Sequence, residues 1–501
     1  MSNKDIVQEL WYLCDILRDS GISYSEHLTE LVQLLFIKMV HQNSDAELLK
    51  QHPLPKGCRW TDLTSQPAAE QLAYYQQMLS QLSSGKDGQG NPVHDDLQLL
   101  GIYAHAQTRL SDPRHLTQLI KSLDLLNFKE HNLGDLFEDL LAKNASENTK
   151  TGAGQYFTPR VLIRSMVRNI KPSSGQIIQD PAMGTGGFFA AAHNYINQDS
   201  DLAKNTVDPL TQSTFIGVEQ STTTHRLALT NCLLHDIEGK AGVNGPIYLG
   251  DTLGQIGAEL EQADIILTKL PFGRSDTARH DLPFATNNKQ LIYLQHSYHN
   301  LKPGGRAAII LSDNALFEAG IGADIRRDLM DKCNLHTILR LPVGLFYAAG
   351  LKSNVLFFSK GSATDKHQQH HCTEQTWIYD LRSNMPAFGR RNSFDSSQLK
   401  SFERLYGENP DGTSARKAGD WHFTPDDKID HSDFNRWRCF SRDFIHHSQD
   451  DSLDIRWIKD KNAPDTATLP PPAELANKAM IELKSALSGL KGLMKSLEHK
   501  G

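Results

Sequence analysis

The chain has 501 residues, of which 39% are hydrophobic and 22% are charged, and this is the composition of a globular protein rather than a disordered one. Lysine and arginine number 52 and aspartate and glutamate 59, so the net charge is −7. If an acidic chain of this kind binds nucleic acid, its basic residues must cluster on one face or be supplied by a partner.

Two absences narrow the class of protein further. The longest apolar runs fall short of the roughly 18 residues that cross a bilayer, and the amino terminus lacks the basic-then-apolar pattern of a secretory signal. The six cysteines are scattered without Cys-x-x-Cys spacing, which is typical of reduced proteins in a cytosol. We therefore expect a cytoplasmic protein that has no membrane among its partners.

Residues 1–150 are predicted to form a helical domain. Apolar residues recur with helical spacing in three segments, around Leu10, Leu31 and Leu136. This region carries no catalytic motif, so its expected role is packing or contact with partners.

Residues 151–400 have the pattern of a catalytic α/β domain. Short runs rich in β-branched residues alternate with helix-compatible spacers, and they predict buried strands at 176–180, 214–219, 246–251, 263–268, 306–312, 337–342 and 353–359. The alternation is typical of a parallel, Rossmann-like sheet with helices on both faces. The tract 361–372 contains three histidines and a cysteine but no second ligand pair, so we expect a loop there and no metal site.

Two further segments complete the chain. Residues 401–469 are polar and turn-rich and are expected to pack on the catalytic domain, with Trp437 among their anchors. Residues 470–501 open with three prolines, which can begin a helix, and continue with one narrow apolar stripe at positions 475, 479, 483, 487, 490, 494 and 497. A narrow stripe of this kind often packs against another helix, so this C-terminal helical tail is predicted to take part in subunit assembly.

A glycine-rich turn, from Asp180 to Gly187, follows the first predicted strand. Its glycines let the backbone approach a ligand closely, and the next helix offers free amide donors. The second strand ends in Glu219, which is placed to bind ribose hydroxyls, and Asp251 follows the third strand, near the expected adenine edge. Either acid alone could cap a helix, but acids at the ends of successive strands together with the glycines predict a nucleoside site.

These motifs resemble the cofactor-binding motifs of S-adenosylmethionine-dependent methyltransferases. The segment GQYFTPR at 154–160 is similar to the extra cofactor motif that precedes the glycine-rich loop in amino-methylating DNA methyltransferases. The order GAGQYFTPR, QDPAMGTGGF, ALTNCLLHDIEG and PGGRAAIILSDNALFE is similar to the modification (methylase, M) subunit of type I restriction–modification enzymes. This resemblance spans nearly the whole chain.

The resemblance implies transfer of a methyl group from S-adenosylmethionine to the exocyclic amine of adenine in DNA. It assigns to the cofactor site the residues Gln155, Tyr156, Phe157, Thr158, Pro159, Arg160, Asp180, Gly184, Thr185, Gly186, Gly187, Glu219 and Asp251. For Phe157, ordinary core packing is the alternative. The implied partners are DNA, a specificity (S) subunit that reads the DNA sequence, a restriction (R) subunit and a second copy of the M subunit.

One motif departs from the family pattern. Where its members have Asn-Pro-Pro-Phe or Asn-Pro-Pro-Tyr after the fourth strand, this chain has Lys269, Leu270, Pro271 and Phe272 at the catalytic position. In the family, the asparagine oxygen and a proline carbonyl accept the hydrogens of the target amine and orient it.

The two substitutions put this role in doubt. Charged Lys269 has only donors, and Leu270 lacks the fixed φ of proline and adds an N–H group. Phe272 remains able to stack on an extruded adenine. We therefore predict an intact cofactor fold with weak or absent methyl transfer, unless burial makes Lys269 a neutral acceptor.

Two alternative functions follow from the same residues. The chain could be a catalytically inactive subunit that binds cofactor and DNA in the same complex. It could also be a nicotinamide-dependent oxidoreductase, which uses a similar glycine-rich turn, although the GQYFTPR and Pro-Phe segments have no role in hydride transfer.

Overall fold

The computed structural model describes residues 2–23, 26–43, 54–147, 157–199, 214–237, 245–275, 282–346, 351–361, 370–389, 392–416 and 436–458, and parts of 474–488. The chain divides into two compact units, Met1–Arg456 and Trp457–Gly501. Among the described residues, no helix is long and apolar enough to cross a membrane.

The first part of the larger unit is helical, as the sequence predicts. Its helices are α1 (Asn3–Asp19), α2 (His27–Gln42), α4 (Trp60–Thr64), α5 (Gln71–Ser84), α6 (Leu97–Ile102), α7 (Pro113–Asp124) and α8 (Leu133–Glu147). Polar side chains fix several of their starts. Ser2 and Asp5 form a capping box on α1, and Asp112 caps α7 with Pro113 in its first turn.

Among the described residues, nine strands form one sheet in the order β3-β2-β1-β4-β5-β7-β6-β8-β9. They are β1 (Ile177–Asp180), β2 (Thr214–Glu219), β3 (Ile247–Leu249), β4 (Ala263–Lys269), β5 (Leu301–Ser312), β6 (Cys333–Arg340), β7 (Ser353–Lys360), β8 (Gln375–Asp380) and β9 (Trp437–Ser441). Pairing is parallel from β3 across to β5. The strand order reverses between β1 and β4, so the crevice expected in an open α/β sheet lies at their carboxyl ends.

All of the runs predicted as strands form strands, but the prediction of a parallel sheet is wrong for β7. This strand pairs antiparallel with both β5 and β6. A buried strand has the same continuous apolar run in either direction, so its sequence does not indicate its direction. The connection from β6, residues 341–352, contains no helix in its described part, whereas a parallel crossover usually requires one.

The segment 401–469 contributes more regular structure than its polar composition predicts. Strand β9 pairs antiparallel with β8, and the Trp437 ring stacks on Trp377 with centroids 5.2 Å apart. The helices of this part are α16 (Ser397–Tyr406) and α17 (Arg442–Gln449). In the tail, the described residues between 474 and 488 are helical, and Leu483 and Leu487 are exposed by 70% and 52%. The other stripe positions, 475, 479, 490, 494 and 497, lie outside the described residues.

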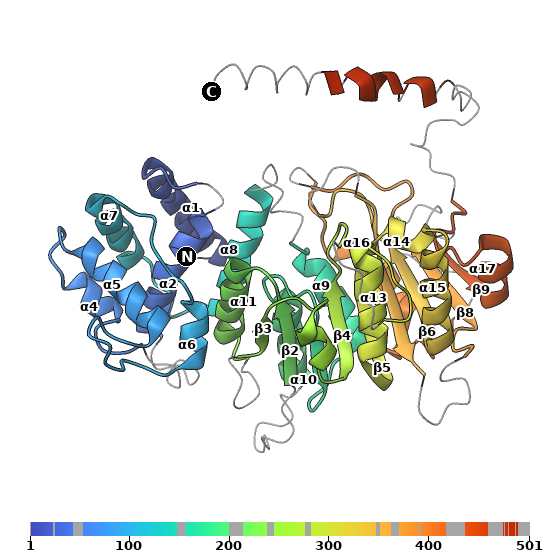
Figure 1. Cartoon of the computed structure of the whole chain (residues 1–501), viewed down its shortest axis with the longest axis horizontal. Coiled ribbons are helices and arrows are strands. Elements are labelled where there is room, and N and C mark those ends of the chain that lie inside the picture. The colour runs from blue at the N-terminus through green and yellow to red at the C-terminus, as the bar shows by residue number, and fades with distance from the viewer. Residues whose placement is uncertain are drawn as a thin grey trace. The chain divides into compact units, whose positions relative to one another are not determined.

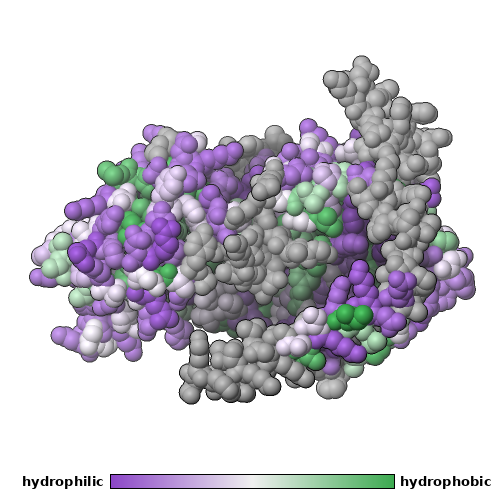
Figure 2. Space-filling view, turned by 90° about the horizontal axis from the view of Figure 1, so that it is seen from above, coloured by the Kyte–Doolittle hydropathy of each residue, from purple (hydrophilic) through white to green (hydrophobic). Residues whose placement is uncertain are grey.

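Helices lie on both faces of the sheet (Figure 1). They are α9 (Arg160–Ile170), α10 (Gly187–Asp199), α11 (Thr222–Leu234), α13 (Lys289–Asn300) and α15 (Ile321–Lys332), with short α12 (Gln255–Glu259) and α14 (Asp313–Phe317). Helix α9 packs against both α10 and α16, and α13 packs against α15. Helix α11 also contacts α2, α6 and α8, so one apolar core joins the helical region to the sheet. Among the residues that are coloured in Figure 2, hydrophilic ones predominate.

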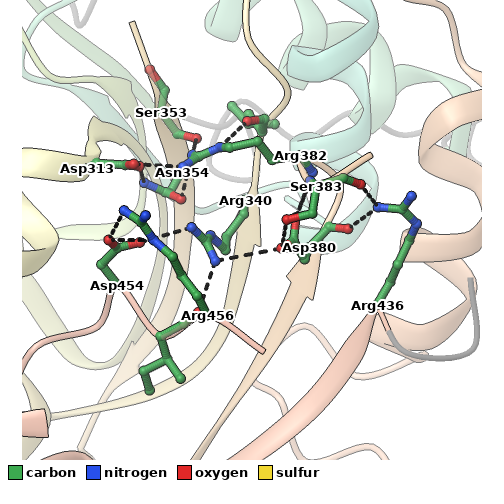
Figure 3. Close-up of polar contacts among 12 residues, drawn as sticks. Asp313, Arg340, Ser353, Asn354, Asp380, Arg382, Ser383, Arg436, Asp454 and Arg456 are labelled. Carbon is green, nitrogen blue, oxygen red and sulfur yellow. Dashed lines mark hydrogen bonds and ion pairs between the residues drawn. The ribbon is translucent and has the colours of Figure 1, made fainter. Parts of the chain in front are cut away.

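A half-buried arginine, Arg382, connects the segments at the strand ends beyond β5 (Figure 3). The Arg382 guanidinium donates to Asp313 Oδ2 at 2.7 Å and to the carbonyls of Leu341 and Ser353 at 2.8 and 2.7 Å. Burial alone would raise the pKa of Asp313, but the hydrogen bond and charge of Arg382 hold it below its ordinary value. One side chain therefore ties α14 to the chain after β6 and to the start of β7.

A second arginine, Arg340 at the end of β6, holds the last segment of the larger unit. Its guanidinium donates to Asp454 Oδ1 and to the Ile455 carbonyl, both at 2.9 Å, and lies 3.6 Å from Asp380 Oδ2. Figure 3 shows Asp380 between Arg340 and Arg436. The segment 451–456 is thus fixed on the carboxyl ends of the strands.

Replacing Arg382 by methionine should destabilise the larger unit by about 3–5 kcal/mol, because Asp313 would remain buried without its cation. The matched control is Arg456→Met, since the Arg456 side chain is 61% exposed and pairs with Asp454 at 2.6 Å. An exposed pair contributes about 1 kcal/mol or less. Urea-induced unfolding of the two variants measures the difference, and equal shifts would contradict this assignment.

Candidate active site

The glycine-rich turn joins β1 to α10 in a conformation that requires glycine. Gly184 and Gly186 have φ values of +59° and +86°, in the left-handed region. The Met183 N–H donates to the Val218 carbonyl at 3.0 Å, and its sulfur lies 2.2 Å from where a Cβ on Gly217 would stand. The turn therefore packs directly on β2, and β2 needs glycine at the crossing.

The Glu219 carboxylate, at the end of β2, accepts hydrogen bonds from this turn. Its Oε2 accepts the Gly184 N–H at 3.0 Å, and its Oε1 accepts the Ser221 N–H at 2.8 Å. Burial raises the pKa of Glu219, although these two N–H groups act to lower it. The structure thus brings together two of the residues that the resemblance assigns to the cofactor.

Asp251 lies at the same edge of the sheet, after β3, and is exposed. Its Oδ1 accepts the Leu253 N–H at 2.9 Å and so closes a turn before α12, but the N-cap residue of that helix is Gly254, so Asp251 does not cap it. The next residue, Thr252, is buried and its hydroxyl donates to the Pro181 carbonyl. Thr252 thereby fixes the loop after β3 to the glycine-rich turn.

A pocket opens at the carboxyl ends of β1 and β4. Of the predicted site residues, its lining includes Phe157, Thr158, Arg160, Asp180, Gly184, Thr185, Gly187 and Lys269. Pro159 lines a neighbouring hollow with Leu345 and Phe388. Gly186 belongs to the turn but is not among the lining residues, and a Cβ on it would stand 3.1 Å from the Met183 methyl group. Gln155 and Tyr156 lie outside the described residues.

Sequence reasoning missed the contribution of α8 to this pocket. Glu138 and Leu141 line it, although we expected no site residue in the helical region. The Arg160 guanidinium lies 2.8 Å from both Asp135 and Glu138 and also pairs with Asp139. These three acids follow i, i+3, i+4 spacing, so the sequence alone places them on one face of a helix. It does not show which basic residue they pair with.

The same acids come close to a histidine. Ligand atoms of Asp135, Glu138 and His235 lie within 4.8 Å of one another, which is the arrangement of a possible cation site. The Arg160 guanidinium already pairs with both carboxylates and neutralises part of their charge. We therefore assign no metal to it.

Two ionisable residues, Asp180 and Lys269, lie at the ends of the adjacent strands β1 and β4. Asp180 is 1% exposed and accepts the Ala182 N–H at 3.0 Å. Burial raises the pKa of Asp180 to about 7 and lowers that of Lys269 to about 7, while the charge of each opposes the shift of the other. The Lys269 Nζ also lies 5.4 Å from the centroid of the Phe346 ring.

Leu270 is fully buried and both of its backbone polar groups are engaged. Its N–H donates to the Ile310 carbonyl at 2.9 Å, a bond that proline could not make. Its carbonyl accepts the Gln290 side-chain amide at 3.4 Å. Pro271 and Phe272 follow and are partly exposed. The carbonyl that orients the amine in the family therefore has a competing donor here.

An open sheet whose strand order reverses at a pocket, with a glycine-rich turn after β1 and an antiparallel β7, defines an α/β methyltransferase fold. A family profile described as N-6 DNA Methylase matches residues 128–437. The methylase subunits of the type I restriction enzymes StySJI of Salmonella typhimurium and EcoKI of Escherichia coli K12 are each 45% identical to this chain, over 99% of its length and 96% of theirs.

Solved structures agree with this match. The crystal structure of the EcoKI M protein has a TM-score of 0.59 and 42% identity, covering 98% of this chain and 96% of that chain. A chain from a type I restriction–modification assembly has a TM-score of 0.68 at 23% identity over 100% of both chains, and it shares the fold. The chain belongs to the N-6 DNA methylase family, among the methylase subunits of type I restriction enzymes.

The variant Lys269→Met should change the pH dependence of stability. The pKa of Lys269 is about 7 in the folded chain and near 10.5 when the chain is unfolded, so between these values the unfolded state binds more protons. The free energy of unfolding of the parent therefore rises with pH across this window. We expect Lys269→Met to be more stable than the parent at pH 7, with an advantage that shrinks towards about pH 10.

Urea-induced unfolding over this pH range measures the effect. Lys302→Met is the control, because its amine pairs with Asp264 at 2.8 Å in a more exposed setting. Parallel pH curves for the parent and Lys269→Met would show that burial does not depress the pKa of this lysine.

Proposed function

We propose that this chain uses S-adenosylmethionine to methylate the exocyclic amine of adenine in DNA, and that Lys269 and Leu270 weaken this transfer. The observation that carries the proposal is the pocket at the ends of β1 and β4, where Lys269 stands beside Asp180 and the glycine-rich turn.

The residues present fit an adenosyl sulfonium. A Cβ on Gly184 would meet no atom within 4 Å, so the turn leaves room for a ligand against its backbone. Glu219 offers further oxygen lone pairs for ribose hydroxyls, and Asp180 offers a carboxyl group near the sulfonium. Bound S-adenosylmethionine supplies an electrophilic methyl group. We assign Phe157, Thr158, Gly184, Thr185, Gly187 and Glu219 to its binding.

The weakening has two causes in this chain. The Leu270 carbonyl already accepts from Gln290, and its direction is fixed by the N–H bond to Ile310. Lys269 accepts a hydrogen bond only when its amine is neutral, and a pKa of about 7 leaves it partly charged at neutral pH. A target amine would thus be held less firmly than by asparagine and proline. These observations also favour a second candidate, a subunit that binds cofactor and DNA without turnover.

The proposed partners are DNA, an S subunit, an R subunit and a second copy of the M subunit. The net charge of −7 supports the assignment of DNA reading to a separate subunit. DNA as the substrate and six free cysteines support a cytoplasmic location. We propose residues 1–150 for partner contacts, 151–400 for catalysis, 401–469 as an extension of that domain and 470–501 for assembly.

The double variant Lys269→Asn/Leu270→Pro should methylate DNA faster than the parent. Restoring the two acceptors is expected to recover about 2.7–4 kcal/mol of barrier, or roughly 100- to 1,000-fold in rate. The measurement mixes each chain with its S subunit, duplex DNA and radiolabelled S-adenosylmethionine, with calorimetry of cofactor binding in parallel. Equal rates would refute the role of Lys269 and Leu270, and no cofactor binding by either chain would refute the proposed function.

Deleting residues 470–501 should weaken assembly with the S subunit, since the helical tail exposes Leu483 and Leu487. Cofactor affinity should stay unchanged, because none of the pocket residues lies in this segment. Co-purification with the S subunit and calorimetry with S-adenosylmethionine measure the two effects. If the truncated chain co-purifies with the S subunit as well as the parent does, the tail has no role in assembly.

A further inference from the structure

Lys269 brings a primary amine into the pocket that we assign to the methyl donor. It leaves the end of β4 and lines the same cavity as Gly184 and Phe157, which belong to the proposed cofactor site. The family has asparagine at this position, whose amide ends close to the backbone. The lysine side chain is longer by two bonds, so its amine extends farther from the backbone than that amide, and the residue lines the pocket.

The groups around Lys269 suit an acceptor of a methyl group. Asp180 from β1, Glu138 from α8 and Arg160 from α9 line the same pocket, and Asp180 is the one whose charge acts on the lysine. Glu138 is already paired with Arg160 at 2.8 Å. Asp180 is therefore the carboxyl group positioned to take a proton from the amine. The Phe346 ring, 5.4 Å from Nζ, favours a methylated ammonium by cation–π attraction.

We propose that the side-chain amine of Lys269 is itself a methyl acceptor, so that the chain methylates its own lysine. This modification site rests on the proposed function, because it requires S-adenosylmethionine in the pocket. It uses the same donor as DNA methylation but needs no DNA.

The chemistry balances as a nucleophilic displacement. The neutral Lys269 amine attacks with its nitrogen lone pair, and a nitrogen–carbon bond forms to the methyl group. The carbon–sulfur bond breaks, the sulfur keeps the bonding pair, and S-adenosylhomocysteine leaves as a neutral thioether. The nitrogen then carries the positive charge, and its excess proton passes to Asp180 or to water. Because burial lowers the pKa of Lys269 to about 7, a large share of the amine is neutral at physiological pH.

The test incubates the purified full chain with methyl-labelled S-adenosylmethionine and no DNA, and maps the label by peptide mass spectrometry. We expect a methyl group on Lys269. Lys269→Arg keeps a positive charge but has no neutral amine, so it should lose the label. Lys302→Arg removes an amine that pairs with Asp264 outside the pocket, and it should keep the label on Lys269. Glu219→Ala, which disturbs the glycine-rich turn, should reduce it.

A second measurement needs no methyl donor. Acylation of the chain with acetic anhydride at a series of pH values reports when a lysine amine becomes neutral, and Lys269 should react with a midpoint near pH 7. A third measurement, calorimetry with S-adenosylmethionine, shows whether the chain binds the cofactor. Cofactor binding with an unmodified Lys269, or label only on other lysines, would overturn this inference and leave the proposed function standing. Absence of cofactor binding would overturn both.

Discussion

The site depends on the burial of two opposite charges at the ends of adjacent strands. The parallel pairing of β1 and β4 brings Asp180 and Lys269 to the same edge of the sheet, at the point where the strand order reverses, and both residues line the pocket there. Burial disfavours both charges. The Asp180 charge is stabilised mainly by hydrogen bonds, among them that of the Ala182 N–H, and to a smaller extent by Lys269, whereas the Lys269 charge is stabilised by Asp180. Both pKa values are about 7 as a result. The fold thus lowers the pKa of Lys269 from its ordinary value to about 7, a shift that the sequence alone does not specify.

The fold was largely predictable because its strands are buried on both faces. Runs such as 214–219 and 263–268 are continuous and β-branched, and they form β2 and β4 at nearly those limits. The direction of β7 was not predictable, since this antiparallel strand has a continuous buried run like that of the parallel strand β4. Strand β9 was missed because it is an edge strand whose residues are mostly exposed or half-buried, so it lacks an apolar run.

Sequence reasoning could predict the site residues that belong to short motifs next to a strand, but not those whose partners lie elsewhere in the chain. The turn with Gly184 and the acid Glu219 come together because each follows a strand, and the sheet brings strand ends to one edge. Glu138 could not be placed, because its partner Arg160 becomes a neighbour only when α8 packs on α9. For Leu270, sequence alone showed the extra N–H group but not Ile310, which satisfies it.

The Leu270 bond to Ile310 has a consequence for how this chain could evolve. The Ile310 carbonyl is inside the sheet, so losing its donor would leave a buried acceptor unmatched at a cost of about 1–3 kcal/mol. Proline at position 270 would fix the direction of the carbonyl for the reacting amine, but it would remove the hydrogen bond to Ile310 and so destabilise the sheet. The stability of the sheet therefore limits which residues position 270 can accept.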